Sequence, residues 1–287
     1  MIITNIYGGL GNQMFQYAIG RNLSMQKKTS LIIDKSLFKK YELRDFLLDK
    51  FNIKYLNGKT SFTHRVIITN KYLRKLFSFL NKFSFFQLNI FFEREEFVYN
   101  KEVETTKNIY FYGYWQSLEY FKDIRSQLIK DFTLKQELDF NNLKIKEEIS
   151  NCNSVSLHVR RGDYMKMKDA LNGHGLCSLE YYNKAIKVIT EKVVNPCFYV
   201  FSDDIDWVKD SLEISFPVKF INHNSRNPEK DLVLMKHCKH NITANSTFSW
   251  WAAWLNENPK KIVLMPEKWM NNLKTPEGLI YENSMTL

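Results

Sequence analysis

Short apolar runs alternate with longer segments of helical spacing along most of this chain. The first run, Ile2–Tyr7, is followed by glycines at positions 8, 9 and 11 and then by Asn12–Lys28, whose apolar residues are spread over helical turns. Leu31–Asp34 predicts the next strand. A strand, glycine loop, helix and second strand in this order is typical of the opening of a Rossmann-like layer.

The alternation becomes most regular in the second half of the chain. It predicts strands over Val155–Val159, Phe198–Phe201, Val218–Ile221, Asn241–Ala244 and Ile262–Met265, the last of which is stopped by Pro266. Between these strands it predicts helices over Leu179–Lys192, the stretch up to Leu212, Glu229–His237 and Thr247–Leu255. We therefore expect an α/β protein with two Rossmann-like halves, residues 1–150 and 151–287, joined by a polar linker.

Residues 35–108 are less regular. Val66–Phe92 is predicted to be helical and is basic and rich in Phe, Ile109–Tyr114 predicts a strand, and Leu118–Phe132 predicts a helix. The most apolar part, Phe77–Phe92, is too short and too often interrupted by polar residues to span a bilayer. Two interpretations of Val66–Phe92 remain open: a packed amphipathic helix pair, and a segment that contacts a membrane surface peripherally.

The net charge and the cysteines indicate which kinds of partner and which cellular location to expect. The net charge of +10 favours acidic partners, namely nucleotides, nucleic acid or an anionic membrane surface. No helix-turn-helix, RRM or zinc-finger pattern supports nucleic-acid binding. The four cysteines lack C-x-x-C spacing and are expected to be free thiols. The first residues show no secretion signal, so we expect a cytoplasmic protein, with peripheral contact at the inner face of the membrane left open.

Two adjacent arginines carry the strongest chemical signal. Arg160 and Arg161 follow the predicted strand Val155–Val159 directly, at the strand end where ligands bind in α/β sheets. Their planar guanidinium groups suit bidentate binding of phosphate, and a diphosphate leaving group is the simplest such ligand. A basic surface turn is the alternative. Strand alternation directs Arg161 to the face opposite Arg160, where it could bind structural carboxylates instead.

The glycine loop near the N-terminus is the second candidate. Gly9, Asn12 and Gln13 lie between a strand and a helix N-terminus, where backbone N–H groups favour anions. The dinucleotide fingerprint G-x-G-x-x-G is incomplete because Met14 occupies its third glycine position, although Asp34 ends the next strand. A dinucleotide-dependent oxidoreductase and a tight turn without a ligand both stay open.

Further polar residues are expected at strand ends and helix starts in the second half. Ser202 and Asp203 follow a strand; Asn245, Ser246 and Thr247 begin an aromatic helix and could hold phosphate; and Asp231, near a helix start, could bind a base edge or ribose. Structural capping explains each of these equally well. Asp204 and Asp206 fit the weak D-x-D pattern of metal-dependent sugar transfer.

Two segments could contact a sugar or act in proton transfer. Gly113–Ser117 ends a predicted strand with aromatic rings and an amide, which suit sugar faces and hydroxyls, although a strand end in the core explains it as well. His174, in the long loop after the arginines, is a candidate base or a solvated loop residue.

Taken together, these segments resemble the bacterial α-1,2-fucosyltransferases of glycosyltransferase family 11. The matching stretches occur in the family's order: GGLGNQMFQYA from Gly8, GYWQS from Gly113, HVRRGDY from His158, HGLCSLEYY from His174, FSDD from Phe201 and ANSTFSWWAAWL from Ala244. Residues 35–108 match none of the family's motifs.

The resemblance implies a GT-B-like fold, with two Rossmann-like domains facing a cleft, the first on the acceptor side and the second binding GDP-L-fucose. It also implies inverting transfer of L-fucose to the 2-hydroxyl of a β-galactoside in surface polysaccharide or oligosaccharide synthesis, without a metal or other cofactor. The implied roles are β-phosphate contact for Arg160, guanine contact for His158 and Asp231, pyrophosphate contact for Ser246 and Thr247, and fucose and phosphate contact for Gly9, Asn12 and Gln13. No residue stands out as a general base.

Overall fold

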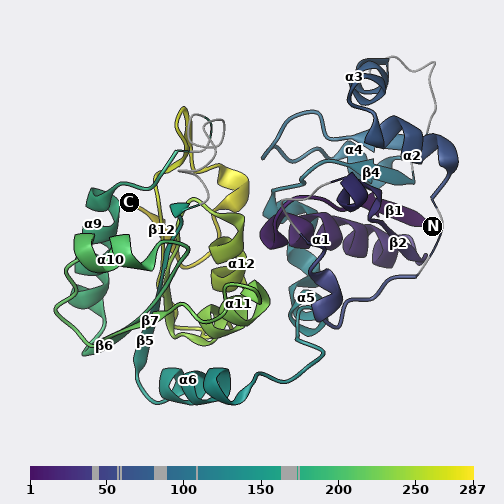
Figure 1. Cartoon of the computed structure of the whole chain (residues 1–287). Helices are drawn as coiled ribbons and strands as arrows, with labels where there is room; N and C mark the ends of the chain where they lie inside the picture. The colour runs from purple at the N-terminus through teal and green to yellow at the C-terminus, as the bar shows by residue number, and fades with distance from the viewer. Residues whose placement is uncertain are drawn as a thin grey trace. The chain divides into compact units, whose positions relative to one another are not determined.

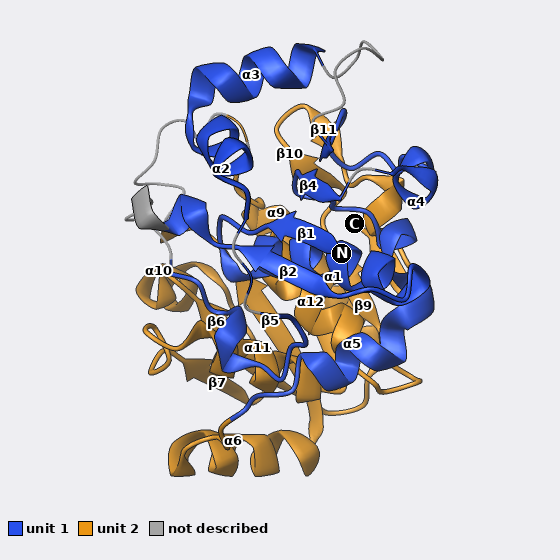
Figure 2. Cartoon of the chain, turned by 90° about the vertical axis from the view of Figure 1, so that its right-hand side faces the viewer, with its two compact units in different colours: residues 1–135 blue, residues 136–287 orange. Residues whose placement is uncertain are grey.

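The structure is a computed structural model that describes residues 1–40, 45–56, 58, 60–80, 89–107, 109–162, 173 and 175–287. It divides into two compact units, residues 1–135 and 136–287, which are coloured separately in Figure 2. Within the described residues, each unit contains its own parallel sheet covered by helices (Figure 1). This confirms the predicted α/β class with two Rossmann-like units.

The first unit is built on a sheet whose described strands have the order β2-β1-β4-β3 and run parallel. These strands are β1 (Ile2–Asn5), β2 (Leu31–Asp34), β3 (Ile90–Phe92) and β4 (Tyr110–Tyr112). The helix α1 (Leu10–Gln26) connects β1 to β2 and packs closely on them. A Cβ atom on Gly20 would lie 2.8 Å from Leu31 Cδ1, so this glycine permits the close approach of helix and sheet.

Helices α2 (Phe62–Thr69) and α3 (Lys71–Leu80) follow, and Ile67 and Ile68 of α2 pack on the sheet with Ile3, Ile32 and Phe92. The prediction of helix throughout Val66–Phe92 is wrong at its end. Ile90–Phe92 is strand β3, paired with β4, because these apolar residues complete a sheet whose partner strand lies about twenty residues further along the chain. Residues 81–88 lie outside the described part.

The remaining elements of the first unit are short. The helix predicted over Leu118–Phe132 is divided at Phe121, whose backbone has φ of −154°. Next to this break, the backbone carbonyl of Tyr120 accepts a hydrogen bond of 2.7 Å from Asn22 Nδ2 of α1. The short elements are η1 (Ser36–Lys40), η2 (Leu48–Lys50), α4 (Glu102–Thr105), η3 (Leu118–Tyr120), η4 (Lys122–Ile124) and α5 (Arg125–Asp131).

The second unit contains a larger parallel sheet, whose described strands have the order β12-β9-β8-β5-β6-β7. Helices α9 and α10 cover one face and α11 and α12 the other (Figure 1). The bounds are β5 (Asn153–Val159), β6 (Pro196–Ser202), β7 (Val218–Ile221), β8 (His240–Ile242), β9 (Val263–Met265) and β12 (Ser284–Thr286), with α9 (Leu179–Lys192), α10 (Ile205–Ser211), α11 (Pro228–His237) and α12 (Thr247–Leu255).

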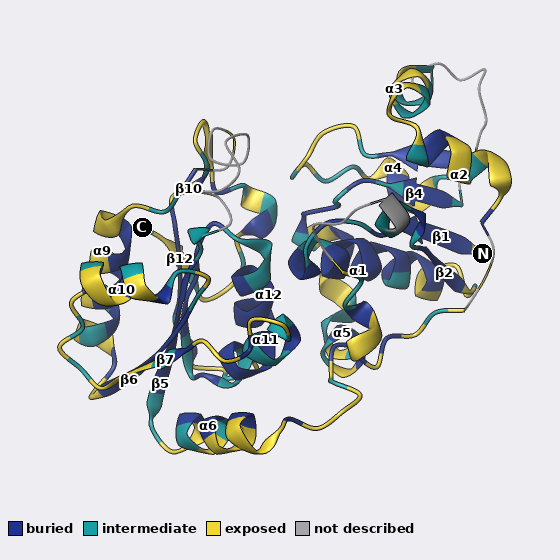
Figure 3. Cartoon of the chain, in the orientation of Figure 1, coloured by how far each residue is buried: buried dark blue, intermediate teal, exposed yellow. Residues whose placement is uncertain are grey.

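The two faces of β5 differ in chemistry. Val155, Leu157 and Val159 point into the apolar core formed with α9 and α10. The alternate residues face α11 and α12: Ser156 accepts a hydrogen bond from Asn241 Nδ2 at 2.7 Å, and His158 contacts Phe248 of α12. Figure 3 shows this sheet as the buried centre of the unit. The period-two alternation of the sequence thus places a histidine beneath the arginines on a polar, buried face.

Ile262–Met265, predicted to be the last strand, is followed by further strands. After β9 come the antiparallel pair β10 (Lys268–Met270) and β11 (Leu273–Lys274), the short η5 (Glu277–Leu279) and then β12, which adds to the sheet beside β9. The sequence of β12, Ser-Met-Thr, is short and largely exposed, so it lacks the apolar alternation that would reveal a strand.

The helix α6 (Phe140–Ser150) lies within the predicted first half of the chain but packs on α11 of the second unit. Asn142 of α6 and Asn224 exchange side-chain hydrogen bonds of 2.8 and 3.0 Å, and Lys230 Nζ of α11 lies 2.8 Å from Asp139 Oδ2 at the α6 N-cap. These contacts explain why the units divide after Lys135, whereas the sequence suggested a linker near residue 150.

Candidate functional site

The strongest candidate site lies where β5 and β6 end side by side. Their register pairs Val159 with Ser202, so the residues that follow each strand meet at one edge of the sheet. This juxtaposition brings Arg160 and Arg161 beside Asp203 and Asp204. Parallel strands that end at a common edge are the usual location of ligand sites in α/β proteins.

Asp203 organises this turn. Its Oδ1 accepts hydrogen bonds from the backbone N–H groups of Arg161 and Gly162, at 2.8 and 2.9 Å, and its Oδ2 lies 3.3 Å from Arg160 Nη1. A Cβ atom on Gly162 would lie 2.8 Å from the Asp203 carbonyl oxygen, so glycine allows the two loops to approach. Asp203 therefore holds the Arg160 guanidinium at the strand end, where 23% of its side chain remains exposed. Beside it, Ser202 Oγ accepts from the N–H of Asp204 at 2.9 Å.

Arg161 has different partners from Arg160. Its Nε lies 3.4 Å from Asp204 Oδ2, and its guanidinium lies over the Trp207 ring, 4.5 Å from the centroid. The ion pair with Asp204 agrees with the alternative that Arg161 binds a structural carboxylate, and a ligand contact by Arg161 stays a prediction. A stacked and paired guanidinium stabilises the packing of α10 against the turn.

The D-x-D pair forms a helix start. Asp204 is the N-cap of α10 and accepts from the N–H of Trp207 at 3.4 Å, while the side chain of Asp206 is 95% exposed and faces Lys209. Among the described residues, no three His, Cys, Asp or Glu side chains gather as metal ligands.

His158 lies beneath Arg160 and is 5% exposed. Burial, followed by the positive charge of Arg160, lowers the pKa of His158 to about 3. The imidazole is therefore neutral at physiological pH and adds no charge to the site. Its ring contacts Phe248, with centroids 5.7 Å apart, and its buried Nδ1 makes no hydrogen bond within the described part of the chain.

The start of α12 supplies polar groups of two kinds. Asn245 is buried and holds loops together: its Nδ2 donates to the carbonyls of Gly175 and Trp269, at 3.3 and 3.2 Å. Ser246 caps the helix by accepting from the N–H of Phe248 at 3.3 Å. Ser246 and Thr247 are half-buried at the helix N-terminus, where the helix dipole favours an anion.

Asp231 belongs to a different polar cluster. Its Oδ1 accepts a hydrogen bond of 2.8 Å from Asn224, which in turn bonds Asn142 of α6. Burial raises the pKa of Asp231 to about 7, and the neighbouring Glu229 adds to the shift. The Asp231 carboxyl group is therefore partly protonated and partly ionised near neutral pH.

The glycine loop of the first unit has a well-defined shape. Gly8 has φ of +82°, Gly9 is the N-cap of α1, and Asn12 Oδ1 accepts a hydrogen bond of 3.1 Å from Gln116 Nε2. Gln13 is fully buried: its Nε2 donates to the carbonyls of Gly8 and Asp45, and its Oε1 accepts from the N–H of Leu47. Both polar atoms of the Gln13 amide are thus bonded inside the protein, where they shape the loop.

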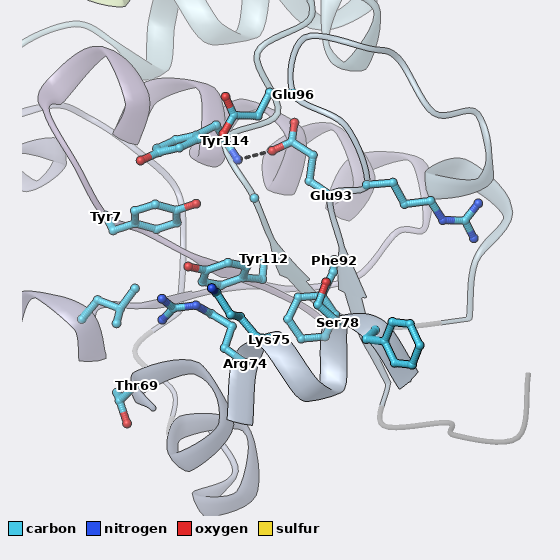
Figure 4. Close-up of a pocket in the computed structure, with 14 residues that line it drawn as sticks. Tyr7, Thr69, Arg74, Lys75, Ser78, Phe92, Glu93, Glu96, Tyr112 and Tyr114 are labelled. Carbon is cyan, nitrogen blue, oxygen red and sulfur yellow. Dashed lines mark hydrogen bonds between the residues drawn. The ribbon is translucent and has the colours of Figure 1, made fainter. Parts of the chain in front are cut away.

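A pocket of about 820 Å³ lies at the carboxyl ends of β1, β3 and β4 (Figure 4). Three tyrosine rings lie side by side in this pocket. The rings of Tyr7 and Tyr112 are stacked with centroids 5.4 Å apart, and the ring centroid of Tyr114 lies 4.8 Å from that of Tyr7. Arg74 of α3 lies over Tyr112 at 5.4 Å. The sequence motif at Gly113 indicated part of this pocket but gave no sign of Arg74 or Glu93.

Glu93 holds the pocket wall. Its carboxylate accepts from the backbone N–H groups of Tyr114, at 2.6 Å, and Trp115, at 2.9 Å. These bonds fix the bend after β4, where Trp115 has φ of +60° and is fully buried. Burial raises the pKa of Glu93 to about 7 although both N–H groups favour the ionised form. Glu93 directly follows Ile90–Phe92, so recognising that segment as a strand would have revealed a polar residue at a strand end.

The candidate base His174 and the residues that follow Gly162 in the arginine motif, Asp163 and Tyr164, lie outside the described residues.

Comparison with known proteins places these features in a family context. The chain is 37% identical to an α-1,2-colitosyltransferase from Escherichia coli over 94% of this chain and 92% of that protein. It is 29% identical to the mouse galactoside 2-α-L-fucosyltransferase Sec1 over 50% of this chain and 41% of that protein.

The structure resembles that of the α-1,6-fucosyltransferase NodZ soaked with GDP-fucose, with a TM-score of 0.53 and 15% identity over 92% and 94% of the two chains. This similarity shows a shared GT-B-like fold of two Rossmann-like units. The sequence model described as glycosyl transferase family 11 matches residues 1–282. With this match over nearly the whole chain, the protein belongs to glycosyltransferase family 11.

Proposed function

We propose that the protein transfers L-fucose from GDP-L-fucose to the 2-hydroxyl of a β-galactoside, with inversion at the anomeric carbon, in the synthesis of a surface polysaccharide or oligosaccharide. The observation that carries the proposal is the Arg160 guanidinium, held by Asp203 at the end of β5 in a member of family 11. The α-1,2 linkage and the fucosyl group agree with the named activities of two relatives.

The second unit supplies groups suited to a departing nucleoside diphosphate. Negative charge grows on the β-phosphate as the glycosidic bond breaks, and Arg160 provides fixed positive charge at the strand end. Ser246 and Thr247 at the start of α12 offer a second anion-binding element for the pyrophosphate. His158 is neutral, so it is suited to donating or accepting a hydrogen bond near the guanine base. The positive charge of the site is then that of Arg160.

The first unit supplies a surface suited to the acceptor. Sugar rings present C–H faces that stack on aromatic side chains and hydroxyls that bond polar groups, and the pocket beside Tyr7, Tyr112 and Tyr114 offers both. Gly9 and Asn12 lie in the loop that joins β1 to α1, and we propose that they contact the fucose and phosphate of the donor.

A GDP-release assay tests the function. GDP-fucose is supplied with a panel of β-galactosides, and the linkage of each product is determined. We expect release that depends on the galactoside and a product linked α-1,2. Guanosine-diphosphate-linked colitose is the matched donor control, because the 37% identical relative transfers colitose. A strong preference for that donor would replace fucose in the proposal. Titration with NAD(P) tests the oxidoreductase alternative, and titration with random DNA tests the nucleic-acid alternative. Tight binding of NAD(P) or of DNA would oppose the proposed fucosyl transfer.

Chelation should not affect the reaction. We expect equal initial rates in the same assay with and without EDTA, because the proposed stabilisation of the leaving group comes from Arg160 and a helix N-terminus. Loss of activity in EDTA that Mn²⁺ or Mg²⁺ restores would show that a metal ion takes part.

GDP affinity should rise with pH through Asp231. We propose that the ionised Asp231 accepts the paired N–H donors of guanine, which adenine and uracil lack. Since the pKa of Asp231 is about 7, the ionised fraction and hence the GDP association constant should rise about tenfold from pH 6 to 8. Calorimetry with GDP and ADP at each pH checks this, because phosphate titration affects both nucleotides and cancels in their ratio.

The matched variant is Asp231→Asn, which retains an acceptor for Asn224. It should lose the pH dependence of the GDP-to-ADP ratio and weaken GDP binding by about 1–3 kcal/mol. A ratio that changes with pH as strongly in the variant as in the wild type would remove the role of Asp231. Equal affinities for the two nucleotides in the wild-type protein would oppose the GDP-sugar donor itself.

We also propose a cytoplasmic protein that contacts the inner face of the membrane peripherally. In the part of the chain that the structure describes, no helix is both long and apolar enough to cross a bilayer. Support for surface contact comes from the basic and aromatic segment around α3.

A further inference from the structure

The helix α3 is attached to the first unit along one side. Phe77 packs against the apolar cluster of β1, β3 and α2. Arg74 Nη1 donates to the Ile68 carbonyl at 2.6 Å, and its guanidinium lies over Tyr112, as Figure 4 shows. Positions 74 and 77 are three residues apart and therefore lie on one face of the helix, which fixes its orientation on the unit.

The outward side of α3 is apolar. Tyr72, Leu76 and Phe79 are 83%, 49% and 58% exposed, and their spacing of four and three residues places them on one stripe. Phe79 lies at the edge of this stripe and also lines the pocket of Figure 4. None of the residues of α3 is buried, and the helix is drawn in the exposed and intermediate colours throughout Figure 3. A stripe of large apolar side chains on a surface helix marks an interaction face.

The charges beside this stripe indicate its partner. Lys71 and Lys75 are exposed and lie next to it, one turn apart, and Lys75 also lines the pocket of Figure 4. Residues 60–80 also include Arg65 and Arg74 and contain no Asp or Glu. Basic residues interleaved with aromatic and aliphatic ones suit the interface of an anionic bilayer, where apolar side chains enter between the headgroups and lysines meet the lipid charge.

We propose that the face of α3 formed by Tyr72, Leu76 and Phe79, with Lys71 and Lys75, docks on an anionic phospholipid surface. This deepens the peripheral location proposed above by naming the face and the lipid chemistry. It does not depend on the donor sugar or on the reaction, so a failure of fucosyl transfer would leave it standing.

Vesicle flotation of the full-length protein tests the inference. The probes are phosphatidylcholine vesicles with and without phosphatidylglycerol. We expect binding to the vesicles that contain phosphatidylglycerol, weak binding to phosphatidylcholine alone, and a decrease with added salt because salt screens surface charge. Absent binding, or equal binding to both vesicle types, would overturn the inference.

Two double variants separate the apolar and charged contributions. Lys71→Ser with Lys75→Ser should weaken binding about 25-fold, since each lysine near the surface contributes about fivefold. Tyr72→Ser with Leu76→Ser should weaken it about tenfold or more. The matched control is Phe140→Ser with Leu143→Ser on α6, which removes apolar side chains that are 81% and 46% exposed beside both acidic and basic residues. The control should bind as the wild type does.

Thermal unfolding and GDP binding of each variant show whether it is folded, and the lysine variant, whose changed side chains are exposed, provides a test even if the apolar variant unfolds. An equal loss in the α6 control would indicate nonspecific adsorption and overturn the assignment to α3. Self-association that the α3 variants abolish, without vesicle binding by the wild type, would identify the face as a contact between copies and also overturn it.

Discussion

Replacing Arg160 by alanine should lower kcat about 100- to 1000-fold, the usual cost of removing one fixed donor from a site of developing negative charge. The fold should persist, because Asp203 still accepts the N–H groups of Arg161 and Gly162 and keeps the turn closed. Arg160→Lys should restore only part of the rate, since an ammonium cannot reproduce a planar, two-pronged contact with phosphate. Steady-state kinetics with GDP-fucose and a galactoside acceptor measure both changes.

Arg161→Ala is the matched control for this experiment. Arg161 carries the same charge at the next position, but it is paired with Asp204 and stacked on Trp207. We therefore expect Arg161→Ala to retain most of the activity while lowering the melting temperature modestly. Wild-type kcat in Arg160→Ala would remove the central claim. Equal losses in the two variants would indicate that disruption of the turn, and not loss of one phosphate contact, causes the effect.

Replacing Glu93 by alanine should destabilise the first unit by about 2–6 kcal/mol. The substitution leaves the backbone N–H groups of Tyr114 and Trp115 without their acceptor beside a fully buried indole, and each unsatisfied buried donor costs about 1–3 kcal/mol. Glu93→Gln should cost less because its amide oxygen can still accept one of the two bonds. Chemical denaturation followed by tryptophan fluorescence measures the free energy of unfolding.

The pH dependence of stability provides a second test of Glu93. Its pKa is about 7 in the folded chain and near 4.5 when unfolded, so the folded state binds more protons between these values. The stabilisation from this group is present below about pH 4.5 and is lost as the pH rises to about 7, a change of about 3 kcal/mol. Glu93→Gln should lack this component. A difference in stability between the wild type and Glu93→Gln that is constant from pH 5 to 8 would contradict the assignment.

Local patterns determined much of the second unit. Leu179–Lys192, Val218–Ile221 and Thr247–Leu255 have the bounds that their periodicity predicts. The different partners of Arg160 and Arg161 also agree with strand alternation, because side chains of an extended backbone alternate between its faces. Such features depend on neighbours within a few residues and are therefore legible in the sequence.

Other features depend on partners that are distant along the chain. Ile90–Phe92 forms a strand because β4 lies beside it, and Ser284–Thr286 does so because β9 presents free backbone groups. Glu93 gains its role from backbone N–H groups about twenty residues away. No local pattern specifies such pairings, since the same short segments would satisfy the rules for helix, strand or loop equally well.

The sequence by itself determined the alternating α/β order, the family motifs and the residue types at the two candidate sites. Only the tertiary structure decided which of those residues are bonded inside the protein and which keep part of their side chain accessible. In the structure, Asp203 pairs with Arg160, and Gln13 and Asn245 are buried and bond the backbone of their loops. The apolar stripe of α3 is exposed. The reason is that periodicity assigns a side chain to one face of its own element, whereas register and packing determine what that face meets.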